Sequence, residues 1–168
     1  DDFQFRRALK RCQRRNRDLE VASTTSISSD ECYELYDRYI RARHADGDMY
    51  PPDRDQFDSF LNDPWGCTQY VEFRQSGRLI ALAVVDRMLD GLSAIYTYYD
   101  PDEEVRSLGR YAILWQIEFC RQQSLPYVYL GYWIQDCRKM AYKADYQPLE
   151  ILENNQWQRC DDSLIAVD

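Results

Sequence analysis

Apolar residues recur with a helical period in the two longest amphipathic stretches of the chain. In residues 28–44 they fall at i, i+3, i+4, i+7 and i+8, which predicts a helix with one buried face. The capping-box pattern of Ser28 and Glu31 places the start of this helix, and turn residues after His44 place its end. A wider apolar stripe over residues 107–123 predicts a second long helix that packs on a sheet.

Shorter elements are predicted between and after these helices. Asp53 followed by Gln56 predicts the start of a short helix, with Phe57, Phe60 and Leu61 turned inward. Apolar runs bounded by turn residues predict strands at residues 67–74, 79–87, 92–99, 127–133, 148–152 and 156–160, and a further short helix is expected at 136–144. The run at 79–85 is unbroken, which indicates a strand buried on both faces.

The order of these elements predicts the fold class. An antiparallel meander leads into one β-α-β crossover, so we expect an α/β (α+β) fold with a mixed, mostly antiparallel sheet. The crossover separates two neighbouring strands where its helix begins, and a ligand cleft is expected there. The 168 residues are enough for one core. We expect a basic segment and linker at residues 1–26 and one folded domain at 27–168.

Charge is distributed unevenly along the chain. The formal net charge is −8, which argues against non-specific coating of nucleic acid. The first 17 residues are nevertheless basic, with seven Lys and Arg residues within twelve positions. Two interpretations stay open for this segment: a solvated arm or helix face, or a strip that contacts phosphates.

The six cysteines are widely spaced, with no Cys-x-x-Cys pair, and His44 is the single histidine. A metal site built from this chain alone is therefore not expected. Six cysteines allow three disulfides, but the sequence shows no secretion signal, so we expect free thiols in the cytoplasm. The longest apolar run is far shorter than the roughly 20 residues of a membrane span, so no membrane partner is expected.

Five ordered stretches make the sequence similar to a known family. They are residues 41–48 (Arg-Ala-Arg-His-Ala-Asp-Gly-Asp), 95–102 (Ile-Tyr-Thr-Tyr-Tyr-Asp-Pro-Asp), 106–109 (Arg-Ser-Leu-Gly), 129–134 (Tyr-Leu-Gly-Tyr-Trp-Ile) and 139–143 (Lys-Met-Ala-Tyr-Lys). In these stretches the chain resembles the bacterial aspartate/glutamate leucyltransferases, relatives of the arginyl-tRNA–protein transferases. Its element order resembles the GNAT acyltransferase superfamily. The resemblance covers nearly the whole chain.

The resemblance implies a GNAT-like fold and an aminoacyltransferase. Such enzymes move an amino acid from aminoacyl-tRNA, a co-substrate, to the N-terminal amine of proteins that start with Asp or Glu. The product then enters the N-degron pathway. The likeness of residues 44–48 favours Leu over Arg as the transferred residue. No cofactor is expected in this chain, because the family's iron–sulfur or metal site belongs to a further N-terminal domain that this sequence does not contain.

The transfer reaction suggests roles for particular residues. An α-amine has a pKa of about 7.7–8.0, so the enzyme must align it, remove its proton and stabilise an oxyanion. Arg41 and His44 lie three positions apart at the end of a helix. Arg41 can pair with the acceptor carboxylate, while His44 can donate to it or take the proton. A helix C-cap is the alternative role for His44.

Ser107 and Tyr98 complete the expected catalytic set. Ser107 can cap the crossover helix, whose first amides can bind the oxyanion; a cap alone is the alternative. Tyr98, like Tyr132, lies next to a turn and can stack on the terminal adenosine, although most aromatic residues of strands belong to the core.

The remaining expected substrate contacts are polar or glycine residues near turns. They are Asp100 for an ammonium group, Arg106 and Gly109 before the crossover helix, and Lys139, Tyr142 and Lys143 for the acceptor phosphates of tRNA. An exposed cationic face is the alternative for the last three. Alone, Asp100 is a turn residue.

Two other functions stay open. A GNAT acetyltransferase would use acetyl-coenzyme A, but Tyr111 stands where the pyrophosphate-binding turn at Arg106-x-x-Gly109 needs a small residue. A non-catalytic module would bind tRNA ends or acidic N-termini without forming product.

Overall fold

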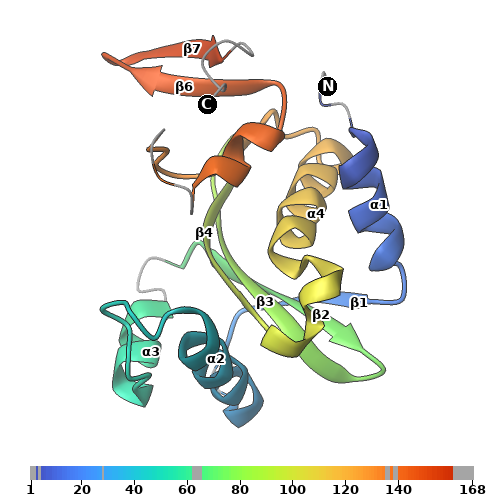
Figure 1. The fold of residues 1–168 in the computed structure, drawn as a ribbon. Helices are drawn as coiled ribbons and strands as arrows, with labels where there is room; N and C mark the ends of the chain where they lie inside the picture. Colours follow the sequence, from blue (N-terminus) through green and yellow to red (C-terminus); the bar gives the residue numbers. More distant parts are fainter. Residues whose placement is uncertain are drawn as a thin grey trace.

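The computed structural model describes residues 3, 5–27, 29–61, 66–134, 137 and 140–160. Its centre is a five-stranded sheet in the order β1-β2-β3-β4-β5, in which β1 to β4 are antiparallel and β5 is parallel to β4 (Figure 1). The strands are β1 (Glu20–Thr24), β2 (Thr68–Gln75), β3 (Arg78–Arg87), β4 (Gly91–Tyr99) and β5 (Tyr127–Tyr129). The predicted mixed, mostly antiparallel sheet with one crossover is therefore confirmed.

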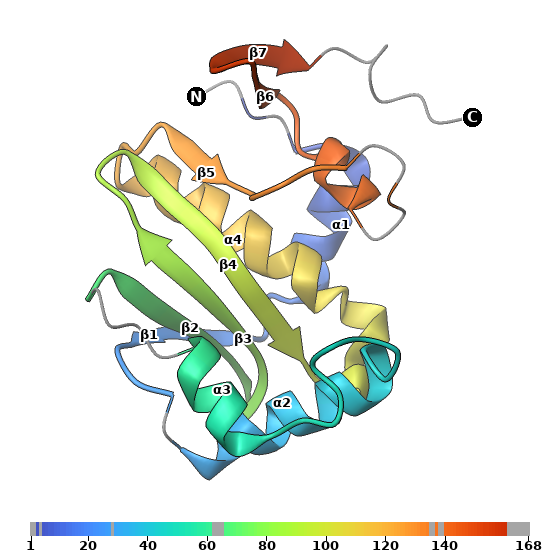
Figure 2. The same ribbon diagram turned by 90° about the vertical axis from the view of Figure 1, so that its left-hand side faces the viewer.

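Helices cover both faces of this sheet (Figures 1 and 2). The crossover helix α4 (Leu108–Gln122) lies on one face with α1 (Arg7–Arg15), while α2 (Asp30–Arg43) and α3 (Arg54–Leu61) lie on the other. The other described elements are the 3-10 turns η1 (Pro101–Arg106) and η2 (Ala141–Asp145) and a separate hairpin of β6 (Leu149–Glu153) and β7 (Gln156–Cys160).

The central strand β3 is buried on both faces, as its unbroken apolar run predicts. Every side chain from Leu79 to Val85 is at most 2% exposed. Leu82 belongs to the core cluster under α2 and α3, whereas Ala83 belongs to the cluster under α4. Burying one large aliphatic side chain stabilises a fold by about 1.5–3 kcal/mol, so this strand anchors both layers.

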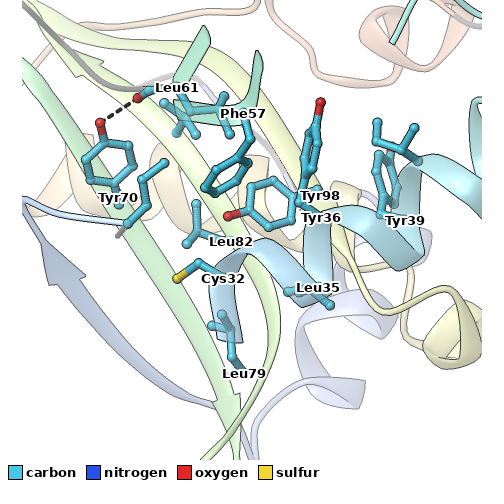
Figure 3. Packing of buried hydrophobic residues seen from close by; sticks show 13 residues of the cluster. Cys32, Leu35, Tyr36, Tyr39, Phe57, Leu61, Tyr70, Leu79, Leu82 and Tyr98 are labelled. Atoms are coloured by element: carbon cyan, nitrogen blue, oxygen red, sulfur yellow. Dashed lines mark hydrogen bonds between the residues drawn. The ribbon is translucent and has the colours of Figure 1, made fainter. Parts of the chain in front are cut away.

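The core under α2 and α3 is rich in aromatic rings (Figure 3). The Tyr36 ring lies 5.0 Å from the Phe57 ring and 5.7 Å from the Tyr98 ring, measured between centroids. The Tyr70 hydroxyl donates to the Leu61 carbonyl at 2.5 Å and ties β2 to the end of α3. The Tyr36–Tyr98 pair is edge-to-face, an arrangement that adds about 0.5–1.5 kcal/mol to simple burial.

The N-terminal region differs most from the sequence prediction. The residues expected as a basic segment and linker form α1 and β1. β1 pairs with β2 along its whole length, and α1 packs on α4 through Leu9 and Cys12. Residues before the expected division at residue 26 therefore contribute a strand to the same sheet as the residues after it. α1 has only three apolar residues among nine, and β1 is a short edge strand. Neither therefore offers an apolar run or stripe long enough to be predicted.

Local boundaries refine the other predictions. The N-cap of α2 is Ser29, whose hydroxyl accepts an amide hydrogen bond at 3.3 Å, while the predicted cap Ser28 lies outside the described residues. Asp53 caps α3 as predicted. Phe60 is 49% exposed and does not point inward as expected, because it covers the edge of the core beside Tyr96. Of the short helix expected at 136–144, residues 141–144 lie in the 3-10 turn η2, residue 137 is not helical, and residues 136, 138 and 139 lie outside the described residues.

Candidate functional site at the splay of β4 and β5

β4 and β5 stay paired for three residues and then separate; the point of separation is termed the splay (Figure 2). Gly91 permits the close approach of the two strands, because a Cβ there would lie 2.2 Å from the Tyr127 carbonyl oxygen. After Tyr129 the chain leaves the sheet, and Gly131 adopts φ +75°. The strand expected at 127–133 therefore ends four residues early. This early end leaves the second half of β4 unpaired on its β5 side.

Three segments bring polar side chains to the open edge of β4 beyond the splay. The splay cluster comprises Tyr39 and His44 from the end of α2, Tyr99 from the end of β4, and Tyr142 and Lys143 from η2. The Tyr39 ring lies 4.9 Å from the Tyr99 ring and 5.3 Å from the His44 ring. Burial raises the pKa of Tyr39, and the nearby hydroxyls of Tyr99 and Tyr142 raise it further. Tyr39 is therefore a neutral hydroxyl at physiological pH.

His44 sits at the C-cap of α2. Its backbone N–H donates to the Ile40 carbonyl at 2.9 Å, which fixes the ring at the end of the helix. The ring nitrogen Nε2 lies 3.4 Å from the Tyr39 hydroxyl, and the tautomer decides which of the two donates. The C-cap role considered for His44 is confirmed, and its half-buried imidazole lies beside the Tyr39 hydroxyl.

Lys143 is a cation at the splay without a carboxylate partner among the described residues. Its Nζ donates to the Tyr132 carbonyl at 2.5 Å and lies near Gly131. Partial burial lowers the pKa of this ammonium. Because most other cations near the splay, such as Arg43 with Glu104, are neutralised by carboxylates, Lys143 is the group that can best attract an anionic substrate.

Two predicted site residues are buried in the structure. The Tyr98 ring is 0% exposed between Tyr36 and Phe57, so the expected contact with a nucleoside is wrong for this structure. Asp100 is also 0% exposed; its carboxylate pairs with Arg38 and with Arg78, each at 3.1 Å.

The expected role of Asp100 toward a substrate ammonium is therefore wrong as well. Its oxygens are occupied by two guanidinium groups and by the Asp102 amide, which donates at 3.1 Å. A buried carboxylate is stable only when it is paired in this way, so Asp100 is a structural link between α2, β3 and η1.

The turn before α4 holds three predicted residues in structural contacts. The Arg106 guanidinium donates two hydrogen bonds of 2.9 Å to Asp18 and one to Glu103, which occupies the group expected to bind substrate. Ser107 has φ +54° and makes no side-chain cap hydrogen bond, so the expected cap is absent. The Tyr99 ring packs close to Gly109, because a Cβ added at residue 109 would lie 3.4 Å from a ring carbon of Tyr99.

The remaining predicted residues are placed apart or outside the description. Arg41 is exposed and donates to Asp37 at 2.9 Å, whereas His44 contacts Tyr39, so the expected pair does not share a contact. Tyr132 is 90% exposed and reaches the cluster through its carbonyl. Lys139 lies outside the described residues.

Two members of the splay cluster are absent from the predicted set. Tyr39 follows the apolar stripe of α2, and the period alone assigns it to the core. Its position in the last helical turn, close to the single histidine, is the signal that marks it. Tyr99 alternates with Tyr98 along β4, so the two point to opposite faces of the sheet, but the sequence does not show which of them joins the cluster.

Among the described residues, no group of three His, Cys, Asp or Glu side chains is placed so that it could hold a metal ion. The six cysteines are free thiols. In the described part of the chain, no helix is long and apolar enough to cross a membrane.

Residues 31–153 match the family model described as arginine-tRNA-protein transferase, C terminus. The chain is 53% identical over 166 residues to the aspartate/glutamate leucyltransferase of Teredinibacter turnerae, covering 98% of this chain and 68% of that protein. The proteins of the same name from Saccharophagus degradans and Stutzerimonas stutzeri are 53% and 55% identical, with 67% and 64% of their lengths covered. The chain thus spans about two thirds of the length of these relatives.

Solved acetyltransferases share the fold. A possible acetyltransferase from Clostridium difficile has a TM-score of 0.55 at 12% identity, covering 76% of this chain and 87% of that one. The ribosomal-protein-S18-alanine N-acetyltransferase from Escherichia coli has a TM-score of 0.51 at 17% identity, covering 74% and 76%. At such identities the likeness concerns the fold alone, and it confirms the expected GNAT-like architecture.

Proposed function

Because this chain belongs to the arginine-tRNA-protein transferase family, we propose that it transfers leucine from leucyl-tRNA to the N-terminal amine of proteins that start with Asp or Glu. The observation that carries the proposal is 53% identity over 98% of the chain to a protein named aspartate/glutamate leucyltransferase. Leucine is preferred to arginine because the similar relatives carry that name. Tagging of proteins for the N-degron pathway in the cytoplasm, where charged tRNA is available, follows as part of the proposal.

The reaction needs a base more than it needs a nucleophile on the enzyme. The neutral acceptor amine attacks the carbonyl carbon of the aminoacyl ester, an amide bond forms, and the ester C–O bond breaks. The proton lost by the amine ends on the ribose hydroxyl that leaves. We assign this proton transfer to His44, with Tyr39 as a positioning residue that holds the imidazole through the 3.4 Å contact. Such general acid–base help contributes about 10²–10⁴-fold.

The negative first residue of the acceptor needs a cation. Lys143 is the proposed partner, because it lies in the splay cluster and no carboxylate pairs with it among the described residues. Arg41, the partner expected from the sequence, would first have to leave Asp37. The first amides of α4 are the proposed donors to the oxyanion, since a helix N-terminus favours negative charge.

The other functions are less well supported. The acetyltransferases share the fold at only 12–17% identity, whereas the leucyltransferases share more than half of the residues. A binding module without activity would not need a histidine beside a neutral hydroxyl at the splay.

The test offers one Asp-starting peptide to the protein with leucyl-tRNA, arginyl-tRNA or acetyl-coenzyme A in separate reactions. Mass spectrometry of the peptide then identifies the added group. The proposal predicts a leucine adduct from leucyl-tRNA. An acetyl adduct, or no adduct from any donor, would contradict it.

A further inference from the structure

α1 carries an exposed row of cations on a chain of net charge −8. Four of them fall at i, i+3, i+4 and i+7 of the helix and therefore share one face, and a fifth follows after the helix ends. They are Arg7, Lys10, Arg11, Arg14 and Arg17, and are termed the α1 strip. No acidic residue occurs from Phe3 to Arg17. Among the described residues, no carboxylate pairs with any member of the strip.

Many arginines elsewhere in the described chain are paired. Arg38, Arg43, Arg54, Arg74, Arg78, Arg106 and Arg110 all form ion pairs with Asp or Glu. Cations that are left unpaired side by side repel one another, and an external polyanion removes that repulsion. The strip is therefore a part of the described surface that attracts such a partner.

The strip is held rigidly by the opposite face of the helix. Leu9 and Cys12 are buried in a cluster with Leu114 of α4. Asn16, which is 0% exposed, donates to the Arg106 carbonyl at 2.9 Å and fixes the end of α1 beside the turn before α4. Because the helix cannot rotate, its cations keep one fixed outward direction. A rigid row loses little conformational entropy when it binds.

A surface hollow accompanies the strip. It has a volume of about 630 Å³ and is lined by Phe5, Arg7, Lys10, Gln13, Arg14 and Arg17. Four of these six residues are cationic. A concave, basic surface of this composition fits the sugar–phosphate backbone of a nucleic acid, because Arg and Lys supply most phosphate contacts in such complexes.

The strip also lies in a useful position relative to the splay. The buried face of α1 packs with Tyr146, which directly follows η2, and η2 carries Tyr142 and Lys143 of the splay cluster. In Figure 2, η2 is drawn in front of α1. The strip lies on the opposite face of α1 from Tyr146, so a polyanion bound to it reaches the splay by passing around the helix.

We propose that the α1 strip binds the phosphate backbone of the tRNA acceptor stem and so delivers the aminoacylated end to the splay. The proposal rests on the proposed function for its choice of tRNA as the polyanion. The −8 net charge repels nucleic acid over most of the surface, so the strip orients the tRNA as well as holding it.

The test compares two double variants with the same change in charge. Lys10→Gln with Arg14→Gln removes the middle of the strip, and Arg121→Gln with Arg159→Gln removes two exposed cations elsewhere. Fluorescence anisotropy measures the Kd for uncharged tRNA. The strip variant is expected to weaken binding about tenfold and to reduce the slope of log Kd against log salt by about 1 for each cation removed. The control variant should leave both unchanged.

Two further measurements separate this proposal from the proposed function. Transfer from leucyl-adenosine, which has no stem, should be the same in the strip variant and the unaltered protein. If neither protein transfers leucine from any donor, the proposed function fails, while the tRNA Kd still tests the strip. Two results for tRNA would overturn the proposal: an unchanged Kd in the strip variant, or an equal loss of binding in the control variant. Binding to phosphatidylserine vesicles is measured as well. If the strip variant loses binding to the vesicles but keeps its binding to tRNA, the proposal is also overturned.

Discussion

The His44 imidazole lies 3.4 Å from the Tyr39 hydroxyl, although the two residues are five positions apart. Tyr39 lies within α2, and His44 is the C-cap of that helix. The contact is possible because α2 stops at Arg43 and the chain turns back on itself. Tyr39 is held in turn by the Tyr99 ring. A core residue thus positions the candidate base at the splay.

Replacing these two side chains should separate their roles. His44→Ala is expected to lower kcat about 10²–10⁴-fold, with partial rescue by added imidazole, because the base is lost but its site remains. Tyr39→Phe keeps the ring packing and removes one hydrogen bond, which corresponds to about a three- to tenfold loss. Tyr33→Phe on the same helix is the matched control, since Tyr33 faces Phe57. Equal losses for Tyr39→Phe and Tyr33→Phe would contradict the positioning role.

Lys143 should determine the preference for acidic acceptors. Lys143→Met is expected to raise KM for an Asp-starting peptide about tenfold or more, because a hydrogen bond between charged groups is lost, while KM for leucyl-tRNA stays nearly constant. Lys143→Arg should retain most of the preference. Arg41→Ala is expected to have the smaller effect on KM, since Arg41 is already paired with Asp37. A larger effect of Arg41→Ala would instead assign the binding of the acceptor carboxylate to Arg41.

The same residue sets an alkaline limit. Burial lowers the pKa of Lys143, so its ammonium loses the proton at a lower pH than an ordinary lysine does. The protonated form attracts the acceptor carboxylate, so the preference for Asp over Ala peptides should fall as pH rises through this pKa. The ratio of kcat/KM values for the two peptides, measured up to pH 10, reports the change. In Lys143→Arg the ratio should stay constant.

Asp100 should matter for stability. Asp100→Asn leaves Arg38 and Arg78 around a neutral buried group and is expected to cost about 3–5 kcal/mol of unfolding free energy, as for other broken buried ion pairs. Asp102→Asn, two residues further on and exposed, is the control and should be within about 0.5 kcal/mol of the unaltered protein. Urea unfolding measures both. If Asp100→Asn has the same unfolding free energy as the unaltered protein, the Asp100 carboxylate is not buried and paired as described.

Asp18 should give stability a dependence on acid. The Arg106 guanidinium lowers the pKa of Asp18 to about 2. A carboxylate with a lowered pKa in the folded state contributes stability above its unfolded pKa near 3.9, and this contribution is lost as pH falls toward about 2. Because Asp18 is half exposed, Asp18→Asn should cost at most about 1 kcal/mol at pH 7 and less in high salt. Thermal unfolding is measured for the unaltered protein and Asp18→Asn between pH 2 and 7. The two unfolding temperatures should become equal near pH 2.

Local patterns in the sequence predict much of the fold. The unbroken run of β3, the stripes of α2 and α4 and the cap at Asp53 are each determined by residues close in sequence. α1 and β1 escape prediction because their apolar contacts are few and come from α4 and β2, which are distant in the chain. The resemblance of five short stretches identifies the family correctly.

The site is less predictable than the fold. Tyr98 and Tyr99 are identical neighbours, but alternation along β4 buries the first and places the second at the splay. Asp100 and Arg106 read as substrate contacts because their partners, Arg38 and Asp18, lie far away in sequence. Only tertiary structure shows that these charges are already neutralised. Lys143 stands out for the opposite reason, because no carboxylate neutralises it among the described residues.

The central claim is leucine transfer to acidic N-termini, and one measurement tests it most directly. Radiolabelled leucyl-tRNA is offered with three peptides that differ only in their first residue, Asp, Glu or Ala, and kcat/KM is determined for each. The Asp and Glu peptides should be labelled with kcat/KM at least about tenfold above that of the Ala peptide, because only they place a carboxylate beside Lys143. Equal labelling of all three peptides, or none, would contradict it.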